Sequence, residues 1–237
     1  RWLEISPDTS KVAYQSGRDE VRVRDLDDFS VETVAKQEIW GFQNGIPRWS
    51  PDGRYLMFTG YIDFERDVFL VDTKNGNKLM NLTMTGVTEA ATTWGPDGKY
   101  IYFASSRTAP QYPKGGGNVN LYRLPLQKFD QPYRDEKFDE LFAKEEKGKK
   151  EKKDSIVVVI DAENIMERIE RVGPSFGTQS GAYVVKDGDK TVVLYGSNHE
   201  GRFTLYKTVY EDFEDTMTEV FMGRGVGNAT DLVTVKG

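Results

Sequence analysis

The chain has no cysteine and one histidine, His199, and these absences exclude several kinds of chemistry. Without cysteine there is no disulfide, no thiolate zinc site and no cysteine nucleophile. Because carboxylates are then almost the only metal ligands left, we expect no metal and no cofactor. A serine triad would need His199 as its base. The surrounding sequence, YGSNHEGRFTLY, instead predicts a turn residue between two strands.

Long apolar runs and an excess of positive charge are also missing. No run of about 18 apolar residues occurs, so we expect no membrane insertion. The formal net charge is −6 and the isoelectric point is about 5.1. Nucleic acids and anionic membranes are bound through a basic face that displaces their counterions. We therefore expect neither as a partner.

The first residues, RWLEISPD, include neither an initiator methionine nor the apolar core of a signal peptide. We therefore expect the chain to be processed or excised from a longer polypeptide. The compartment of a soluble protein, periplasm or cytoplasm, is left open by this sequence.

A repeat is present instead. The chain contains ISPDTSKVAYQSG from Ile5, WSPDGRYLMFTG from Trp49 and WGPDGKYIYFASS from Trp94. The prolines at positions 7, 51 and 96 are 44 and 45 residues apart. Blades of β-propellers repeat at about this period, roughly 40 to 45 residues. With 38% hydrophobic and 12% aromatic residues, the chain can fill a core between such blades.

Each copy has the sequence pattern of antiparallel strands joined by tight turns. Pro-Asp-Gly predicts a tight turn, because proline presets φ and glycine tolerates positive φ. An alternating run rich in β-branched and aromatic residues follows it, as in RYLMFTG. Third and fourth runs, such as DVFLVDT and KLMNLTM, complete the period. We therefore predict an all-β propeller built of four-stranded antiparallel blades.

The predicted blades divide the chain as one propeller segment, residues 1–237. Their approximate ranges are 1–38, 39–85, 86–173 and 174–223, and residues 224–237 begin a further blade. A charged insertion, 129–155, interrupts the third blade. Its mixed Lys/Glu run has no apolar period, which predicts a solvated loop. IVVVID from Ile156 and IMERIERV from Ile165 are predicted strands that close the third blade.

Two further motifs resemble functional signatures only formally. GPSFG, residues 173–177, matches Gly-x-Ser-x-Gly, but that motif needs a helix after the serine. GTQSGAYVV follows instead, so Ser175 is not expected to be a nucleophile. GRGVGN from Gly223 opens no helix and is interpreted as a link between blades. We therefore expect no catalytic residue in this chain.

Aromatic residues fall into two groups. Those at matching blade positions are expected to pack between neighbouring blades, with an aromatic peptide cage as the alternative; they are Trp49, Phe58, Trp94, Phe103 and Tyr195. Others lie on loops that would line a channel mouth. The candidates for contact with a peptide are Tyr61, Phe64, Arg107 and Tyr112.

The repeat resembles the WD-like propeller repeats of the TolB and tricorn type, whose mark is Trp-Ser-Pro-Asp-Gly before an aromatic-aliphatic strand. The copies at Trp49 and Trp94 match it closely, whereas the copy at Ile5 lacks the Trp and the Gly. The charged insertion and the following IVVVIDAENIMERIERVG are similar to a segment of tricorn-like peptidases. Ile160-Asp161 and Glu167-Arg168 take the places of its Ile-Asp and Glu-Arg.

The resemblance implies a non-catalytic propeller of a tricorn-like serine peptidase, which channels peptides to an active site on another domain of the same polypeptide. Such propellers have six or seven blades, more than this chain supplies. One alternative is a standalone TolB-type propeller that acts as a scaffold for protein partners. Another is the propeller of a prolyl-oligopeptidase-type enzyme. Open edge strands also predict a homo-oligomer joined edge to edge.

Overall fold

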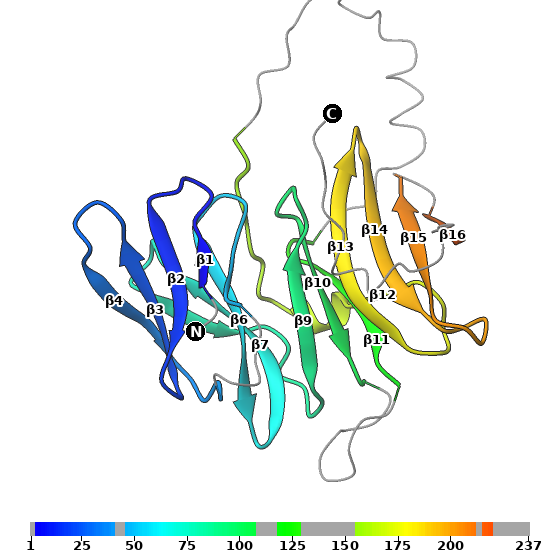
Figure 1. Cartoon of the computed structure of the whole chain (residues 1–237), viewed down its shortest axis with the longest axis horizontal. Coiled ribbons are helices and arrows are strands. Elements are labelled where there is room, and N and C mark those ends of the chain that lie inside the picture. The colour runs from blue at the N-terminus through cyan, green and yellow to red at the C-terminus, as the bar shows by residue number, and fades with distance from the viewer. Residues whose placement is uncertain (1–2, 41–45, 108–117, 129–154, 212–214, 220–237) are drawn as a thin grey trace, which may run out of the picture.

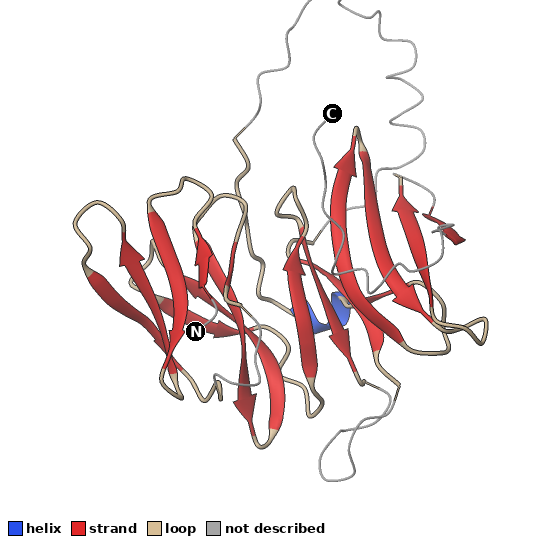
Figure 2. Cartoon of the chain, in the orientation of Figure 1, coloured by secondary structure: helices blue, strands red, loops and turns tan. Residues whose placement is uncertain are grey.

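The computed structural model describes residues 3–40, 46–107, 118–128, 155–211 and 215–219. These residues form four four-stranded sheets and one turn of 3-10 helix, η1 (Ile165–Arg168). Figure 2 shows strands throughout the described part of the chain. The predicted all-β propeller of four-stranded antiparallel blades is therefore confirmed. Each sheet is called a blade below.

The blades follow one another in sequence. Blade 1 comprises β1 (Leu3–Ile5), β2 (Lys11–Ser16), β3 (Glu20–Asp25) and β4 (Val31–Lys36). Blade 2 comprises β5 (Arg48–Trp49), β6 (Tyr55–Ile62), β7 (Glu65–Asp72) and β8 (Lys78–Asn81). Blade 3 comprises β9 (Glu89–Trp94), β10 (Tyr100–Ser105), β11 (Asn120–Pro125) and β12 (Glu170–Val172). Blade 4 comprises β13 (Gln179–Asp187), β14 (Lys190–Ser197), β15 (Thr204–Tyr210) and β16 (Asp215–Glu219).

The path of the chain gives the propeller two different ends. Within every blade the strands are antiparallel and neighbours in sequence order. The first-to-second and third-to-fourth connections therefore lie at one end, which we call the turn face. The second-to-third connections and the passages from blade to blade lie at the other end, which we call the crossover face. Figure 1 shows the blades side by side in chain order, with the turn face at the top.

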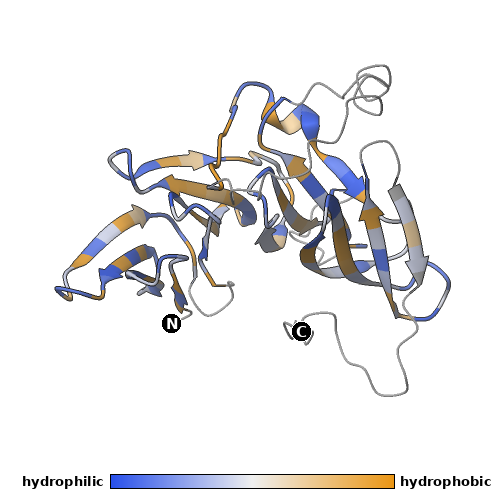
Figure 3. Cartoon of the chain, turned by 90° about the horizontal axis from the view of Figure 1, so that it is seen from above, coloured by the Kyte–Doolittle hydropathy of each residue, from blue (hydrophilic) through white to orange (hydrophobic). Residues whose placement is uncertain are grey.

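Side chains alternate along each strand, so each blade contacts both of its neighbours. On β6, Leu56 and Phe58 pack in a cluster with blade 1, whereas Tyr55 and Met57 pack in a cluster with blade 3. A third cluster, around Tyr195, joins blades 3 and 4. The apolar strands facing these clusters are visible in Figure 3. All five aromatic residues predicted to pack between blades are buried in the clusters: Trp49, Phe58, Trp94, Phe103 and Tyr195.

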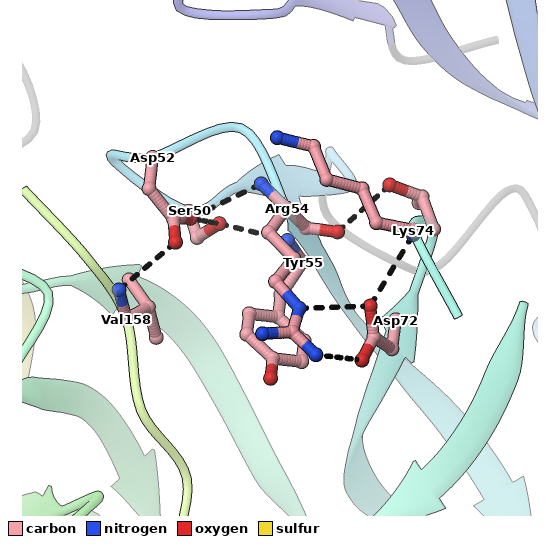
Figure 4. A network of polar contacts seen from close by, with 8 residues as sticks. Ser50, Asp52, Arg54, Tyr55, Asp72, Lys74 and Val158 are labelled. Atoms are coloured by element: carbon pink, nitrogen blue, oxygen red, sulfur yellow. Dashed lines mark hydrogen bonds and ion pairs between the residues drawn. The ribbon is translucent and has the colours of Figure 1, made fainter.

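In blades 1 and 2 the Pro-Asp turn is closed by the aspartate and a serine, as Figure 4 shows for blade 2, whereas blade 3 has Gly95 in place of the serine. The Ser50 hydroxyl donates to Asp52 Oδ1 (2.5 Å) and accepts from the Tyr55 N–H (2.8 Å). Asp52 Oδ1 also accepts from the Arg54 N–H (3.1 Å). In blade 1, the same bond from the Ser6 hydroxyl lowers the pKa of Asp8 to about 2. The repeated motif is thus a self-contained hydrogen-bonded turn.

The predicted strands at Ile156–Asp161 and Ile165–Val172 are largely wrong. Of these residues only Glu170–Val172 pair in a sheet, and Ile165–Arg168 form η1. The stretch before η1 is extended but belongs to no sheet. The Val158 side chain is fully buried in the cluster between blades 2 and 3, and its N–H donates to Asp52 Oδ2 (2.9 Å). Val158 therefore fills a groove between blades, whereas Ile156, Val157 and Val159 are 43% to 67% exposed.

The charged insertion, apart from Ser155, and the predicted fragment 224–237 lie outside the described residues. The blade boundaries given above stay predictions. The observed sheets span residues 3–36, 48–81, 89–172 and 179–219.

Candidate functional site

The crossover face carries large apolar side chains on its connections. Their exposed fractions run from 43% to 69%, and they are Ile62, Phe64, Met84, Phe176 and Phe203. Two lie at the β6–β7 hairpin and one between blades 2 and 3. The others lie between blades 3 and 4 and in the β14–β15 connection. Exposed apolar side chains on connecting loops are candidates for contact with a ligand.

An aromatic pair joins blades 1 and 2 on this face. Trp40, in the passage between the blades, stacks on Tyr61 of β6 with 4.6 Å between the ring centroids. The Arg18 guanidinium lies 6.0 Å from the Trp40 ring, and that of Arg66 lies 5.9 Å from the Tyr61 ring. Arg18 is also ion-paired with Glu38 (2.5 Å), so its charge is already balanced on this face.

Backbone contacts fix the position of Tyr61. Its N–H donates to the Glu38 carbonyl (2.6 Å), and its carbonyl accepts from Gln37 Nε2 (2.7 Å). Both partners lie just before Trp40 in the passage from blade 1. Partial burial raises the pKa of the Tyr61 hydroxyl. The aromatic pair is held by the blade framework rather than by a free loop.

The structure describes three of the four residues that the sequence suggested for contact with a peptide. Tyr61 and Phe64 belong to one hairpin, and Phe64 is 60% exposed at its tip, with φ of 71°. Arg107 is exposed just after β10, with its guanidinium 5.7 Å from the Tyr122 ring centroid. Tyr112 lies outside the described residues. That these side chains contact a peptide remains a prediction.

A buried acidic layer lies beneath the connections between blades 2 and 3. Asp67 accepts from Asn81 Nδ2 (2.7 Å) and from the Thr85 N–H (3.1 Å). Both carboxyl oxygens of Glu89 lie 2.9 Å from Thr85 Oγ1, and Ser105 Oγ donates to Oε1 (3.1 Å). Thr85 Oγ1 is also 3.4 Å from Asp67 Oδ1, so one hydroxyl links the two carboxyl groups.

Burial gives Glu89 unusual protonation behaviour. Its side chain is fully buried, and this burial raises the pKa of the carboxyl to about 7. The charge of Asp67 acts in the same direction, whereas the hydroxyl bonds from Thr85 and Ser105 oppose it. This residue was missed at the sequence level. A carboxylate opening an apolar strand of the core, TEAATTW, is the signal that could have found it.

His199 lies in the β14–β15 connection, as predicted. Its Nδ1 lies 2.9 Å from Ser197 Oγ, and its ring lies 4.5 Å from that of Tyr206. Ser197 is fully buried, and its hydroxyl is also 3.4 Å from Gln179 Nε2. A nucleophile has to be reached by its substrate, and the buried Ser197 hydroxyl is not accessible in this way. The contact between Ser197 and His199 is therefore an internal hydrogen bond.

The GPSFG segment does not form a nucleophile elbow. Strand β13 follows Ser175 where the motif requires a helix. Gly177 has φ of 77°, and a Cβ there would lie 2.9 Å from the His199 Cα. Because glycine has no Cβ, Gly177 allows the β12–β13 and β14–β15 connections to approach each other closely on the crossover face.

Neither a metal centre nor a membrane helix is found in the part of the chain that the structure describes. No group of three or more His, Asp or Glu residues there is placed to hold a metal ion. No helix among the described residues is long and apolar enough to cross a bilayer.

The comparison with protein families gives the class of the protein. The model of the TolB beta propeller domain matches residues 3–128, just over half of the chain. The chain therefore belongs to the TolB beta propeller domain family. A comparison with curated protein sequences gave no match.

Solved structures share the fold at low sequence identity. The tricorn protease superposes with a TM-score of 0.60 at 12% identity, over 92% of this chain and 22% of that one. TolB from Acinetobacter baumannii gives 0.54 at 16%, over 92% of this chain and 42% of that one. A putative TolB from Agrobacterium tumefaciens gives 0.53 at 18%, over 92% and 63%. The chain spans less than two thirds of each of these structures, and the likeness shows a shared β-propeller fold.

Proposed function

We propose that this chain is a non-catalytic binding propeller, which takes up extended peptide segments on its crossover face. The observation that carries the proposal is the presence of five exposed apolar side chains on the connections of that face, beside the stacked Trp40–Tyr61 pair. Loops on a rigid β scaffold are common sites of binding. Large exposed side chains such as Phe64 and Met84 stabilise the isolated fold little, so their presence is better explained by a ligand.

The chemistry of the face favours a peptide with apolar side chains. The stacked rings of Trp40 and Tyr61 supply flat apolar surface, and Phe64 extends it along the same hairpin. Aromatic residues and arginines are enriched among the residues that dominate protein interfaces. Arg66, beside the Tyr61 ring, would favour a peptide that also carries a carboxylate, whereas Arg18 already has Glu38 as its partner.

Two settings fit such a propeller. In the first, it is part of a tricorn-like serine peptidase and passes peptides to an active site on another domain. The charged insertion followed by Ile160-Asp161 and Glu167-Arg168 supports this setting. In the second, it is a TolB-type scaffold whose ligands are segments of protein partners, which the match to the TolB beta propeller domain supports.

A binding titration tests the peptide proposal. The probes are fluorescently labelled ten-residue peptides, one rich in Leu, Phe and Asp and one of Gly and Ser only, followed by anisotropy. We expect micromolar binding of the apolar-acidic peptide and weaker binding of the Gly/Ser peptide. Phe64→Ala and Tyr61→Ala should weaken binding about tenfold, as for residues at the centre of an interface.

The matched control is Val157→Ala, which truncates an apolar side chain that is 67% exposed but lies outside the crossover connections. Equal affinities for both peptides, or equal losses in all three variants, would remove the proposal. The two settings are separated by the mass of the native polypeptide, detected with an antibody against this chain. A band several times larger than 26.9 kDa supports the peptidase setting, and a band near that mass supports the scaffold.

A further inference from the structure

The connection between blades 2 and 3, residues 82–88, belongs to no sheet and is held by buried carboxyl groups. The Thr85 N–H donates to Asp67 Oδ1 (3.1 Å). The hydroxyl oxygen of the same threonine lies 2.9 Å from each carboxyl oxygen of Glu89. Asp67 lies on β7 and Glu89 opens β9, so the strands fix the carboxyl groups and the connection is fastened to them.

The Thr85 hydroxyl is surrounded by more acceptors than it can serve. Besides the two oxygens of Glu89, Asp67 Oδ1 (3.4 Å) and the Val87 carbonyl oxygen (3.1 Å) lie within hydrogen-bond distance of Thr85 Oγ1. A hydroxyl carries one hydrogen, so most of these contacts cannot be filled by it. If both carboxyl groups were ionised, the remaining contacts would bring oxygen atoms together without a hydrogen between them. The arrangement is therefore complete only with one further proton.

The donors around the two carboxyl groups place this proton on Glu89. Asp67 accepts from the Thr85 N–H and from Asn81 Nδ2, and neither group can become an acceptor. Glu89 contacts the hydroxyls of Thr85 and Ser105, which can accept as well as donate. A protonated Glu89 can donate to Thr85 Oγ1, which then donates onward to Asp67. Burial, which raises the pKa of Glu89 to about 7, acts in the same direction.

The charged groups on the strands packed against β9 do not neutralise Glu89. Glu65, two residues before Asp67 on β7, is a third acid at this end and accepts from the Thr88 hydroxyl. The other charged residues of these strands and their ends pair elsewhere, lie beside aromatic rings or lie at the turn face; they are Arg48, Arg66, Asp72, Arg107, Lys186 and Asp187. Within the described part of the chain, an ionised Glu89 would therefore face the acids of β7 without a cation of its own.

The same connection carries Met84 onto the crossover face. Its side chain is 69% exposed, and its N–H donates to Asn81 Oδ1 (3.1 Å). Its φ is 35°, a left-handed conformation that a non-glycine residue keeps only where surrounding contacts determine it. The next residue, Thr85, supplies such contacts through Asp67 and Glu89. A change at Glu89 therefore reaches Met84 through one residue.

We propose that this connection is a pH-dependent switch, in which a proton on Glu89 holds Thr85 and keeps Met84 in place on the crossover face, and loss of the proton releases both. Once ionised, Glu89 and Asp67 repel each other across the shared hydroxyl. The two acids lie on paired strands and Thr85 does not, so the connection is the part that moves. Because Met84 is one of the side chains proposed to bind peptides, the protonated form binds them more tightly; this last step rests on the proposed function.

Methyl NMR of the 237-residue chain with ¹³C-labelled methionine tests the switch without a ligand. Over about two pH units on either side of neutrality, the Met84 signal, assigned through Met84→Leu, should titrate with a midpoint at about 7. The signal of Met57, which is fully buried on β6, is the internal reference and should not follow this titration. A Met84 signal that does not change with pH overturns the proposal.

Variants test whether the change passes through the shared hydroxyl. Glu89→Gln keeps a donor where the proton was and should remove the titration of Met84. Thr85→Val removes the hydroxyl at almost the same volume and should remove it too, whereas Thr85→Ser should retain it. Glu200→Gln is the matched control, since it changes a 65% exposed carboxylate on the same face, and should titrate like the wild type. A titration that persists in Glu89→Gln or Thr85→Val overturns the proposal.

A peptide titration connects the switch with binding. The affinity for the labelled apolar-acidic peptide should fall about fivefold or more from about pH 6 to pH 8, a usual size for coupling between two sites. In Glu89→Gln it should stay constant. The aspartates of the peptide are ionised throughout this range. Absence of peptide binding would remove the proposed function and leave the Met84 titration to decide the switch. Equal pH dependence in the wild type and Glu89→Gln would show that the switch does not control binding.

Discussion

The two ends of the propeller are built in different ways. On the turn face, polar groups of Ser50, Asp52 and Tyr55 form hydrogen bonds with one another within six residues of sequence. On the crossover face, the partners are distant in sequence: Asn120 and Gln179, for example, are bonded 59 positions apart. The aspartate that accepts from the N–H two residues later is present in the turns of blades 1, 2 and 3, whereas contacts between blades involve different residues at each interface. This difference explains why the repeat is recognisable at one end of each blade and lost at the other.

Electrostatics differ in the same way. The Ser6 hydroxyl, together with the N–H of Ser10, lowers the pKa of the solvent-exposed Asp8 to about 2. Burial instead raises the pKa of Glu89 to about 7. Stability from Asp8 is therefore present above its usual pKa and is lost as the pH falls toward 2. Stability from Glu89 is complete below pH 4.5 and is lost as the pH rises toward 7.

The largest expected effect concerns Glu89. A shift of this size corresponds to about 3 kcal/mol of unfolding free energy lost between pH 4.5 and 8. Glu89→Gln removes the titration, so its unfolding free energy should fall less over this range and exceed that of the wild type at pH 8. Urea denaturation at several pH values measures this. The control is Glu200→Gln, whose side chain is 65% exposed. Parallel pH curves for the wild type and Glu89→Gln would contradict the prediction.

A smaller effect is expected for Ser50→Ala on the turn face. The buried Tyr55 N–H loses its acceptor, and Asp52 loses a donor, which should cost about 2 kcal/mol in urea denaturation. Ser175→Ala on the crossover face changes an exposed serine and should cost less than about 0.5 kcal/mol. Equal losses for the two variants would mean that the turn hydrogen bonds do not stabilise the blade.

The smallest effect separates two glycines in equivalent turns. Gly98 and Gly188 have φ of 70° and 60°, so alanine strains the backbone at either position. At Gly98 a Cβ would also lie 2.6 Å from Val158 Cγ2, whereas nothing lies within 4 Å at Gly188. Gly98→Ala should therefore cost about 1 kcal/mol more than Gly188→Ala in thermal or urea unfolding. Equal losses of unfolding free energy in the two variants would show that the segment around Val158 shifts to accommodate the added methyl group at no measurable cost.

Much of the fold was predictable because it depends on local patterns. The period of the prolines and the alternation within RYLMFTG identify the blades and their hairpins. The Ile156–Ile160 stretch was predicted wrongly because a run of β-branched residues fits a strand and an interblade groove equally well. Asp52, which decides its position, lies 106 residues away from Val158. No local pattern contains that contact.

The candidate site was predictable only in part. Tyr61 and Phe64 were found because hairpin loops between second and third strands can be located from the repeat. Trp40 was missed, since its contact with Tyr61 depends on how the passage from blade 1 crosses blade 2. Glu89 was missed because burial, which raises its pKa, is a property of the assembled blades.

The sequence by itself determined the turns, the strands and the number of residues per blade, because these depend on backbone preferences and hydrogen bonds between near neighbours. Only the tertiary structure decided which side chains meet across blades and where a carboxyl group is buried. Those outcomes depend on packing between segments far apart in the chain. The crossover face and its contacts between blades are consequently visible only once the blades are placed side by side.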